Sequence, residues 1–202
     1  MTPKLLIATN NRGKVRELRA LLGGLPVELL TPHDLGLKLQ VAEDGSTYAE
    51  NAAKKALAFA QASGLLSLAD DSGLEVAALD GAPGLHSARY SPRPGAGDAE
   101  RRALLLENLQ AAGVPPPWRA QFHAVIAVAR PAGQVALAEG LCPGVIIPEE
   151  RGTGGFGYDP IFLLPELGLT MAELDMEEKN RLSHRARAVM AAKPILRRLL
   201  EG

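Results

Sequence analysis

The segment Leu68-Ala69-Asp70-Asp71-Ser72-Gly73-Leu74 places two adjacent carboxylates directly after a run of apolar residues. Residues 66–69 have the character of a buried strand, and we expect Gly73 to let the chain turn sharply after it. Adjacent carboxylates repel each other and are costly to desolvate unless a cation or hydrogen-bond donors compensate. The segment therefore predicts either a site for a hard cation such as Mg²⁺, which prefers oxygen ligands, or an Asp-rich turn whose side chains cap backbone amides.

A polar turn also follows the first apolar run of the chain. Residues 4–8 (KLLIA) predict a buried strand, the turn is Thr9-Asn10-Asn11-Arg12-Gly13-Lys14, and apolar residues at helical spacing follow it up to Leu22. A strand, a turn and a helix start in this order can hold phosphate through backbone amides and the helix dipole. The turn is not a Walker P-loop, because Ala8 and Val15 replace the first glycine and the hydroxyl residue. The alternative is a solvated polar turn that only caps the helix.

A third group of polar residues surrounds the helix predicted over residues 47–64, whose start has capping-box spacing. Glu43, in the loop that enters this helix, can reach a metal ion shared with Asp71, and the alternative is a solvated loop acid. Lys54 and Lys55 are neighbours on the helix. We expect one of them to point towards the site and the other to be solvated.

A glycine-rich loop over residues 152–160 (GTGGFGYDP) contains the pattern GxGxxG. It is not a Rossmann motif, because no strand clearly precedes it and no helix opens after Pro160. Phe156 or Tyr158 can stack on a flat ring while Asp159 bonds the edge of that ring. The alternative is a flexible loop whose aromatic side chains lie in the core.

A basic cluster precedes and begins the last predicted helix. A loop followed by a helix N-terminus can bring Lys179 and the pair His184-Arg185 together, although their spacing does not place them on one helix face. Ser183 lies between them. The alternative is a basic, solvated terminal helix.

Composition restricts the class of protein. With 202 residues, 47% hydrophobic and 22% charged, the sequence fits one globular domain over residues 1–202 without a linker or repeat. The net charge of −1 and the lack of a basic run exclude bulk attraction to nucleic acid or to a membrane surface. Cys142 is the only cysteine, which excludes a disulfide framework, and no apolar run has the length of a membrane span or a signal peptide core. We therefore expect a cytoplasmic protein.

Four blocks in this order resemble the inosine triphosphate pyrophosphatase family, whose members are nucleoside-triphosphate pyrophosphatases that remove non-standard purines. The resemblance covers nearly the whole chain. Its blocks are residues 8–14 (ATNNRGK), residues 47–55 (TYAENAAKK), residues 68–74 (LADDSGL) with 81–91 (GAPGLHSARYS), and residues 156–159 (FGYD) with 183–185 (SHR).

The resemblance implies an α/β fold, with an elongated mixed β-sheet, flanking helices, two lobes around a central cleft, and a homodimer. It also implies hydrolysis of ITP, dITP and XTP to the monophosphate and pyrophosphate, with Mg²⁺ as the cofactor. Glu43 and Asp71 would bind Mg²⁺, Asp71 would also be the general base, and Ser72 would lie beside the substrate. The other implied substrate-binding residues are Thr9, Asn10, Asn11, Arg12, Gly13, Lys14 and Lys55 for the triphosphate, with Lys54 as the solvated neighbour, and Phe156, Gly157, Tyr158, Asp159, Lys179, Ser183, His184 and Arg185 for the base.

The expected chemistry agrees with these residue types. Phosphate hydrolysis requires neutralised oxygens and an in-line water more than covalent help, and Asp71 would activate a water that attacks the α-phosphorus. Inosine and xanthosine carry a 6-oxo acceptor, so donors from His184 or Arg185 would favour them over adenine. Two other functions stay open: a pyrophosphatase for pyrimidine nucleotides, like the Maf-type relatives of this fold, and a non-catalytic nucleotide-binding regulator. The Phe156 loop argues against the first and the Asp70-Asp71 pair against the second.

Overall fold

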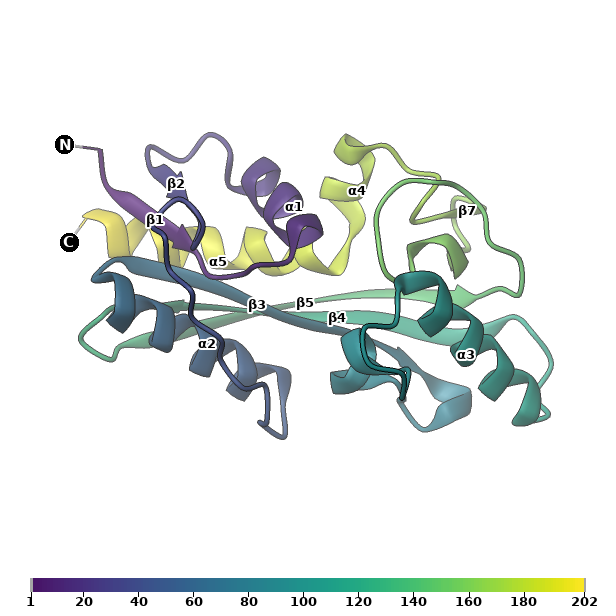
Figure 1. Cartoon of the computed structure of the whole chain (residues 1–202). Coiled ribbons are helices and arrows are strands. Elements are labelled where there is room, and N and C mark those ends of the chain that lie inside the picture. Colours follow the sequence, from purple (N-terminus) through teal and green to yellow (C-terminus); the bar gives the residue numbers. More distant parts are fainter. Residues whose placement is uncertain (1, 202) are drawn as a thin grey trace. The chain divides into compact units, whose positions relative to one another are not determined.

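The computed structural model describes residues 2–201, and its seven strands form one mixed sheet in the order β2-β1-β3-β4-β5-β6-β7 (Figure 1). The strands are β1 (Lys4–Ile7), β2 (Glu28–Leu30), β3 (Leu66–Val76), β4 (Trp118–Ala129), β5 (Val135–Ile146), β6 (Phe162–Leu164) and β7 (Leu169–Thr170). The α-helices are α1 (Arg12–Leu22), α2 (Tyr48–Ser63), α3 (Asp98–Ala111), α4 (Met176–Leu182) and α5 (His184–Glu201), and the 3₁₀ helices are η1 (Ala77–Leu79), η2 (Gly84–Arg89) and η3 (Asp159–Ile161). The predicted α/β class, a mixed sheet with flanking helices, is confirmed.

The chain divides into two compact units. The first comprises the described residues up to Asp71, Ala124–Gly140 and the segment from His184 onwards, and the second comprises Ser72–His123 and Leu141–Ser183. The assignment of residues 1–202 to one domain, and the cleft between two lobes, stay predictions.

In the first unit, β1 pairs in parallel with both β2 and β3. Figure 1 shows α1 and α5 on one face of these strands and α2 on the other. Alternate strand residues point to the face that α1 and α5 cover, where Ile7 and Leu68 are buried with Leu18 of α1 and Val189 of α5. Ile7 lies opposite Leu68, so β1 ends two residues short of Asp70 of β3. Beyond the end of β1, side chains can therefore bond to the main chain of β3, as Lys14 and Lys55 do at the main-chain oxygen of Asp70.

β3 corrects one expectation, because the chain does not turn at Gly73. The strand runs from Leu66 to Val76, so Asp70 and Asp71 lie in its middle and not at its end. Consecutive residues of a strand point to opposite faces, which separates the two carboxylates. Each carboxylate meets cationic side chains on its own side, so their repulsion does not require a turn.

In the second unit, β5 pairs antiparallel with β6, and β6 with β7. The core of this unit includes Leu105 and Leu109 of α3. The rings of Phe122 and Phe162 pack with their centroids 4.4 Å apart. Cys142 is buried in the same cluster, so the only thiol of the chain is part of the core.

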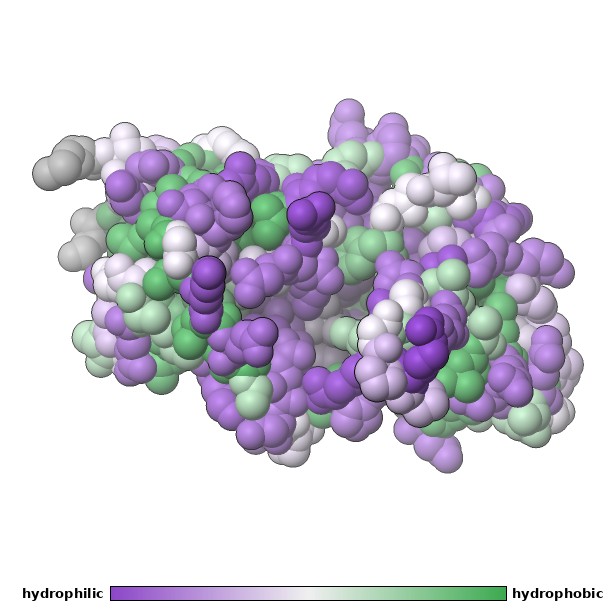
Figure 2. Space-filling model, viewed as in Figure 1, coloured by the Kyte–Doolittle hydropathy of each residue, from purple (hydrophilic) through white to green (hydrophobic). Residues whose placement is uncertain are grey.

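The face of the molecule shown in Figure 2 is mainly polar. Figure 2 shows that hydrophilic residues predominate on the face in view, with apolar residues in scattered groups between them. Large apolar side chains that are exposed include Leu35, Val114, Leu137, Leu141, Leu167, Leu169 and Met190. Between residues 2 and 201, no helix combines the length and the apolar character that crossing a bilayer would require.

Candidate active site

The residues predicted from the sequence to form the site fall into two groups, each within one unit. The first unit holds the turn from Thr9 to Lys14 together with Glu43, Lys55, Asp71, His184 and Arg185. The second unit holds Ser72, Phe156, Gly157, Tyr158, Asp159, Lys179 and Ser183. Because Lys179 and Arg185 fall into different units, their predicted convergence stays a prediction.

The turn after β1 is held by side-chain bonds to the main chain. Thr9 Oγ1 accepts a hydrogen bond from Asn11 N at 3.2 Å, and Asn11 Oδ1 accepts one from Lys14 N at 3.0 Å. Asn11 is therefore the N-cap of α1. Asn10 and Arg12 are exposed on the same turn. This arrangement presents the positive end of the α1 dipole beside a cluster of polar side chains.

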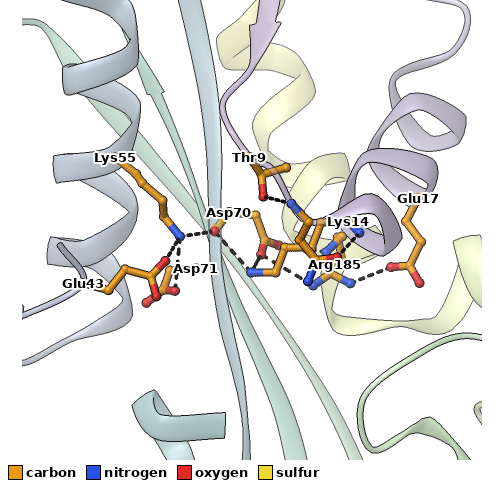
Figure 3. A network of polar contacts seen from close by, with 9 residues as sticks. Thr9, Lys14, Glu17, Glu43, Lys55, Asp70, Asp71 and Arg185 are labelled. Atoms are coloured by element: carbon orange, nitrogen blue, oxygen red, sulfur yellow. Dashed lines mark hydrogen bonds and ion pairs between the residues drawn. The ribbon is translucent and has the colours of Figure 1, made fainter. Parts of the chain in front are cut away.

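Asp70 lies at the centre of a buried ion-pair network (Figure 3). Lys14 Nζ lies 2.5 Å from Asp70 Oδ1, and Arg185 Nε donates to Asp70 Oδ2 at 2.9 Å. Arg185 Nη1 also donates to Glu17 Oε2 at 2.5 Å. Glu17, Asp70 and Arg185 are each no more than 2% exposed. Arg185, which the resemblance assigned to the base, thus links α5 to both α1 and β3 through carboxylates.

Sequence reasoning missed Glu17. A signal was available, because Glu17 follows Lys14 by one helical turn and immediately precedes Leu18 on the buried side of α1. A charge among the apolar positions of an amphipathic helix requires a partner inside the fold. That partner, Arg185, lies 168 residues further along the chain.

The network favours the charged forms of Asp70 and Arg185 but not that of Lys14. Burial alone would favour the neutral carboxyl, but Arg185 and Lys14 outweigh it and hold the pKa of Asp70 well below its usual range. Burial would likewise lower the pKa of Arg185, and Asp70 with Glu17 raises it above the ordinary value instead. The pKa of Lys14 is lowered, mainly by burial, with Lys55 and Arg185 adding to the effect against Asp70.

Asp71 belongs to a second group on the other side of β3 (Figure 3). Lys55 Nζ donates to Glu43 Oε1 at 2.5 Å and to the main-chain oxygen of Asp70 at 2.8 Å, and it lies 3.5 Å from Asp71 Oδ1. Lys54 is exposed and pairs with Asp44 at 2.5 Å. The expectation that one lysine points towards the site while the other is solvated is confirmed, with Lys55 as the inward residue.

The electrostatics of this second group differ from those around Asp70. Burial is the main cause that raises the pKa of Asp71, with Glu43 and Asp70 adding to it against Lys55 and Lys14. Burial would lower the pKa of Lys55, but Asp71 and Glu43 together raise it above the ordinary value. Asp71 is therefore a more basic carboxylate than an ordinary aspartate, beside a lysine that stays protonated.

The loop that carries Glu43 is tied to the first turn of α2. Gly45 N donates to Asn51 Oδ1 at 2.8 Å, and Ser46 N donates to Glu50 Oε2 at 2.7 Å. A Cβ at Gly45 would lie only 2.8 Å from Asn51 Oδ1, so glycine alone fits this approach without a shift. These two bonds fix the main chain just after Glu43.

Glu43 and Asp71 have the donor chemistry that suits Mg²⁺. Both carboxylates already converge on one cation, the ammonium group of Lys55. In the described part of the chain, no group of three or more His, Cys, Asp or Glu side chains is arranged to hold a metal. Mg²⁺ is commonly bound by one or two carboxylates together with waters and substrate phosphates, so two acids fit it.

The second unit contains a separate aromatic cluster on the glycine-rich loop. Asp159 Oδ2 accepts hydrogen bonds from Phe156 N at 2.8 Å and from Lys179 Nζ at 2.5 Å. Lys179 Nζ also lies 5.3 Å from the centroid of the Phe156 ring, within the range of a cation–π contact. Gly155 has φ +71°, and a Cβ there would lie 2.0 Å from Asp159 Oδ2. The cluster therefore depends on glycine at this position.

Tyr158 and Ser183, two further predicted residues of this unit, are buried and donate hydrogen bonds to main-chain oxygens. Tyr158 is buried, and its hydroxyl donates to Ser87 O at 2.9 Å. Ser183 is the C-cap of α4, and its N–H donates to Lys179 O. At the other end of α4, Asp175 and Glu178 form a capping box. The loop is followed by η3 and not by a long helix, in agreement with the exclusion of a Rossmann motif.

Comparison with known proteins identifies the family. The model of the Ham1 family matches residues 5–195. The chain belongs to the Ham1 family. It is 52% identical over 197 residues to the dITP/XTP pyrophosphatase of Desulforamulus reducens, covering 97% of this chain and 96% of that protein. It is 50% identical to the dITP/XTP pyrophosphatase of Geobacter sulfurreducens, covering 94% of each. The resemblance found in the four sequence blocks is thereby confirmed.

Solved Ham1 structures share the fold as well. A HAM1 protein from Coxiella burnetii superposes with a TM-score of 0.86 at 40% identity, covering 97% of this chain and 99% of that chain. The Staphylococcus aureus Ham1 protein gives a TM-score of 0.83 at 37% identity. The Ham1 match includes both groups of polar residues, since residues 5–195 extend from the turn at Thr9 through Asp71 and Phe156 to Arg185.

Proposed function

We propose that this protein hydrolyses ITP, dITP and XTP to the nucleoside monophosphate and pyrophosphate, and so removes non-standard purines from the nucleotide pool. The observation that carries the proposal is the group formed by Glu43, Lys55 and Asp71, in which two carboxylates and an ammonium ion converge beside the turn after β1. The names of the relatives from Desulforamulus reducens and Geobacter sulfurreducens, dITP/XTP pyrophosphatase, support the same substrates.

The charge of the network supports a metal cofactor. The Asp70 network and the Asp71 group together contain four carboxylates and three cationic side chains. The carboxylates are those of Glu17, Glu43, Asp70 and Asp71, and the cations are Lys14, Lys55 and Arg185. The two groups therefore carry a net negative charge. A triphosphate is itself an anion, and its binding requires additional positive charge. We propose that Glu43 and Asp71 hold Mg²⁺ for this purpose. When bound there, Mg²⁺ would neutralise phosphate oxygens and stabilise the charge that develops in the transition state.

Residues of the first unit would activate the attacking water and bind the phosphates. Asp71 would accept the proton of the water that attacks the α-phosphorus, and its raised pKa makes it a better proton acceptor than an ordinary aspartate. Lys55 stays protonated beside it and would bind a phosphate oxygen. The turn from Thr9 to Lys14 would hold the phosphate chain through the amides at the start of α1.

Recognition of the base is assigned to aromatic and hydrogen-bonding residues. Phe156 would stack on the purine ring, and the pair Asp159–Lys179 beside it would bond the edge of the base. His184 and Arg185 are the proposed donors to the 6-oxo group. Arg185 also donates hydrogen bonds to Asp70 and to Glu17.

A homodimer and a cytoplasmic location belong to the same proposal. The homodimer rests on the family resemblance. A reducing compartment is consistent with a single, buried cysteine. Light scattering that gave the mass of one chain at micromolar concentration would contradict the dimer.

The decisive experiment measures pyrophosphate release from ITP, dITP, XTP, GTP, ATP and the pyrimidine triphosphates with Mg²⁺. We expect rapid release from ITP, dITP and XTP, slow release from the others, and loss of release when the metal is chelated. Turnover of pyrimidine nucleotides instead would retain the phosphate chemistry and overturn the role of Phe156. No release from any nucleotide would overturn the enzymatic function and leave a nucleotide-binding regulator.

We expect Lys55→Met to reduce kcat/KM for XTP by about a hundredfold, because a buried ammonium ion beside Asp71 would be lost. The neighbouring substitution Lys54→Met is the matched control, since Lys54 is exposed and pairs only with the exposed Asp44 among the ion pairs described. Its kcat/KM should stay within about twofold of the parent. Equal losses in the two variants would show that charge near α2, and not the position of Lys55, determines activity.

A further inference from the structure

We propose that Asp98 and Arg102 of α3 are positioning residues that hold the Phe156 loop in the conformation used for base stacking. This inference rests on the proposed function, in which Phe156 contacts the purine. Neither residue belongs to the blocks that carry the family resemblance, and neither touches the ring of Phe156 in the contacts described. Their action is on the main chain of Gly157, the next residue of the loop.

Both polar groups of the Gly157 main chain are bonded to α3. Gly157 N donates to Asp98 Oδ2 at 2.7 Å, and Arg102 Nη1 donates to Gly157 O at 2.8 Å. Asp98 and Arg102 are four residues apart, so they project from the same face of the helix one turn apart. Gly157 has φ +63°, a conformation that side chains rarely adopt. The two bonds therefore hold the two peptide units on either side of the Gly157 Cα at a defined position and orientation.

The side chains that make these bonds are themselves held. Arg102 Nε and Nη2 donate to the two carboxylate oxygens of Glu150, each at 2.8 Å. This bidentate pair fixes the plane of the guanidinium group, and the Arg102 side chain is only 11% exposed. Asp98 also forms an ion pair with Arg101, three residues further along α3. Arg102 thus joins Glu150, which precedes the glycine-rich loop, to Gly157, the last glycine of that loop.

Phe156 is consequently restrained from both sides along the chain. Its own N–H is bonded to Asp159 Oδ2, and the residue that follows it is bonded to α3. The residues before it, Gly152 to Gly155, are exposed, and Gly154 N donates to Ala172 O at 2.9 Å. A loop of this composition has high conformational entropy when free. Ordering it in advance lowers the entropic cost of stacking a base on Phe156.

The test compares Asp98→Ala and Arg102→Met with matched controls on the same helix. Glu100→Ala removes another acid of the first turn of α3, and Arg93→Met breaks the ion pair between Arg93 and Glu100. Hydrogen exchange of the peptide covering residues 152–159 reports the order of the loop without requiring activity. Steady-state kinetics with ITP report base binding. Inhibition by inorganic tripolyphosphate reports the phosphate-binding residues, which belong to the other unit.

We expect faster hydrogen exchange of the loop in Asp98→Ala and Arg102→Met, with the KM for ITP raised about tenfold. The inhibition constant of tripolyphosphate should stay within about twofold of the parent, and the conservative variant Asp98→Asn should recover part of the loss. Both controls should behave as the parent does.

Three outcomes would overturn the inference: unchanged loop exchange, faster exchange with an unchanged KM, or parallel losses of ITP and tripolyphosphate binding. The last would indicate general damage to the fold. A parent protein that releases no pyrophosphate from ITP is a different result. It removes the proposed function itself, while the exchange data still report whether α3 orders the loop.

Discussion

Asp71→Asn is expected to lower kcat for XTP hydrolysis by about a thousandfold, the largest catalytic effect of a single substitution in this chain. The amide preserves the shape of the side chain but neither accepts the proton of the attacking water nor binds a metal ion as a carboxylate does. The main-chain oxygen of Asp70 and the carboxylate of Glu43 would still hold Lys55. The loss should therefore arise from the chemical step and not from a displaced lysine.

The same substitution should leave the fold intact. Burial raises the pKa of Asp71, so the folded state disfavours the ionised carboxylate at neutral pH relative to the unfolded chain. Replacing this carboxylate by a neutral amide removes that unfavourable contribution. We expect the free energy of unfolding at pH 7 to be equal to the parent value or higher by up to about 1 kcal/mol.

Asp44→Asn is the matched control for Asp71→Asn. Asp44 is exposed, lies in the same loop as Glu43, and pairs with Lys54 on the surface. Its variant should turn over XTP at the parent rate. An Asp71→Asn variant that kept the parent rate would overturn the assignment of Asp71 as the general base, whatever the stability measurement showed.

The local features of the first unit were predictable from the sequence, because neighbouring residues determine them. The strand at Lys4–Ile7, the capped turn after it and the helix that begins at Tyr48 follow from apolar spacing and from the hydrogen-bonding capacity of Asn11 and Thr47. The opposite directions of Lys54 and Lys55 also follow from helical geometry, since consecutive residues lie on different faces.

Features that depend on distant partners were not predictable in the same way. The prediction of a sharp turn at Gly73 rests on local signals alone, the apolar run of residues 66–69 and the glycine after it. Within the buried strand that the structure has instead, the two adjacent carboxylates repel each other and are costly to desolvate. Lys14 and Arg185, which come from 56 and 115 residues away, remove that conflict for Asp70. The role of Glu17 was not predictable for the same reason, since Arg185, the cation that it pairs with, lies 168 residues further along the chain. Local patterns indicate a buried charge, but only the fold supplies its partner.

Arg185→Met is expected to cause the largest loss of stability, about 3–5 kcal/mol in the free energy of unfolding. The side chains of Asp70 and Glu17 are at most 2% exposed, and the substitution removes the guanidinium group that both carboxylates accept from. A buried carboxylate without its cation loses the compensation for its desolvation. Arg197→Met on the exposed part of the same helix is the control, and its change should lie within about 0.5 kcal/mol.

The pH dependence of the loss in unfolding free energy shows whether Arg185→Met acts by removing the ion pairs or by removing the packing of the arginine side chain. Because the folded state lowers the pKa of Asp70, the stabilisation from its ionised form is present above the unfolded pKa of about 4 and is lost as the pH falls below it. The difference in unfolding free energy between parent and Arg185→Met should therefore be largest near neutral pH and shrink in acid. Adding Glu17→Gln to Arg185→Met removes one of the two buried carboxylates that lose the guanidinium group, and it should recover part of the stability in urea unfolding at pH 7. A difference that stays constant with pH, or a double variant less stable than Arg185→Met, would assign the loss to the packing of the arginine side chain instead.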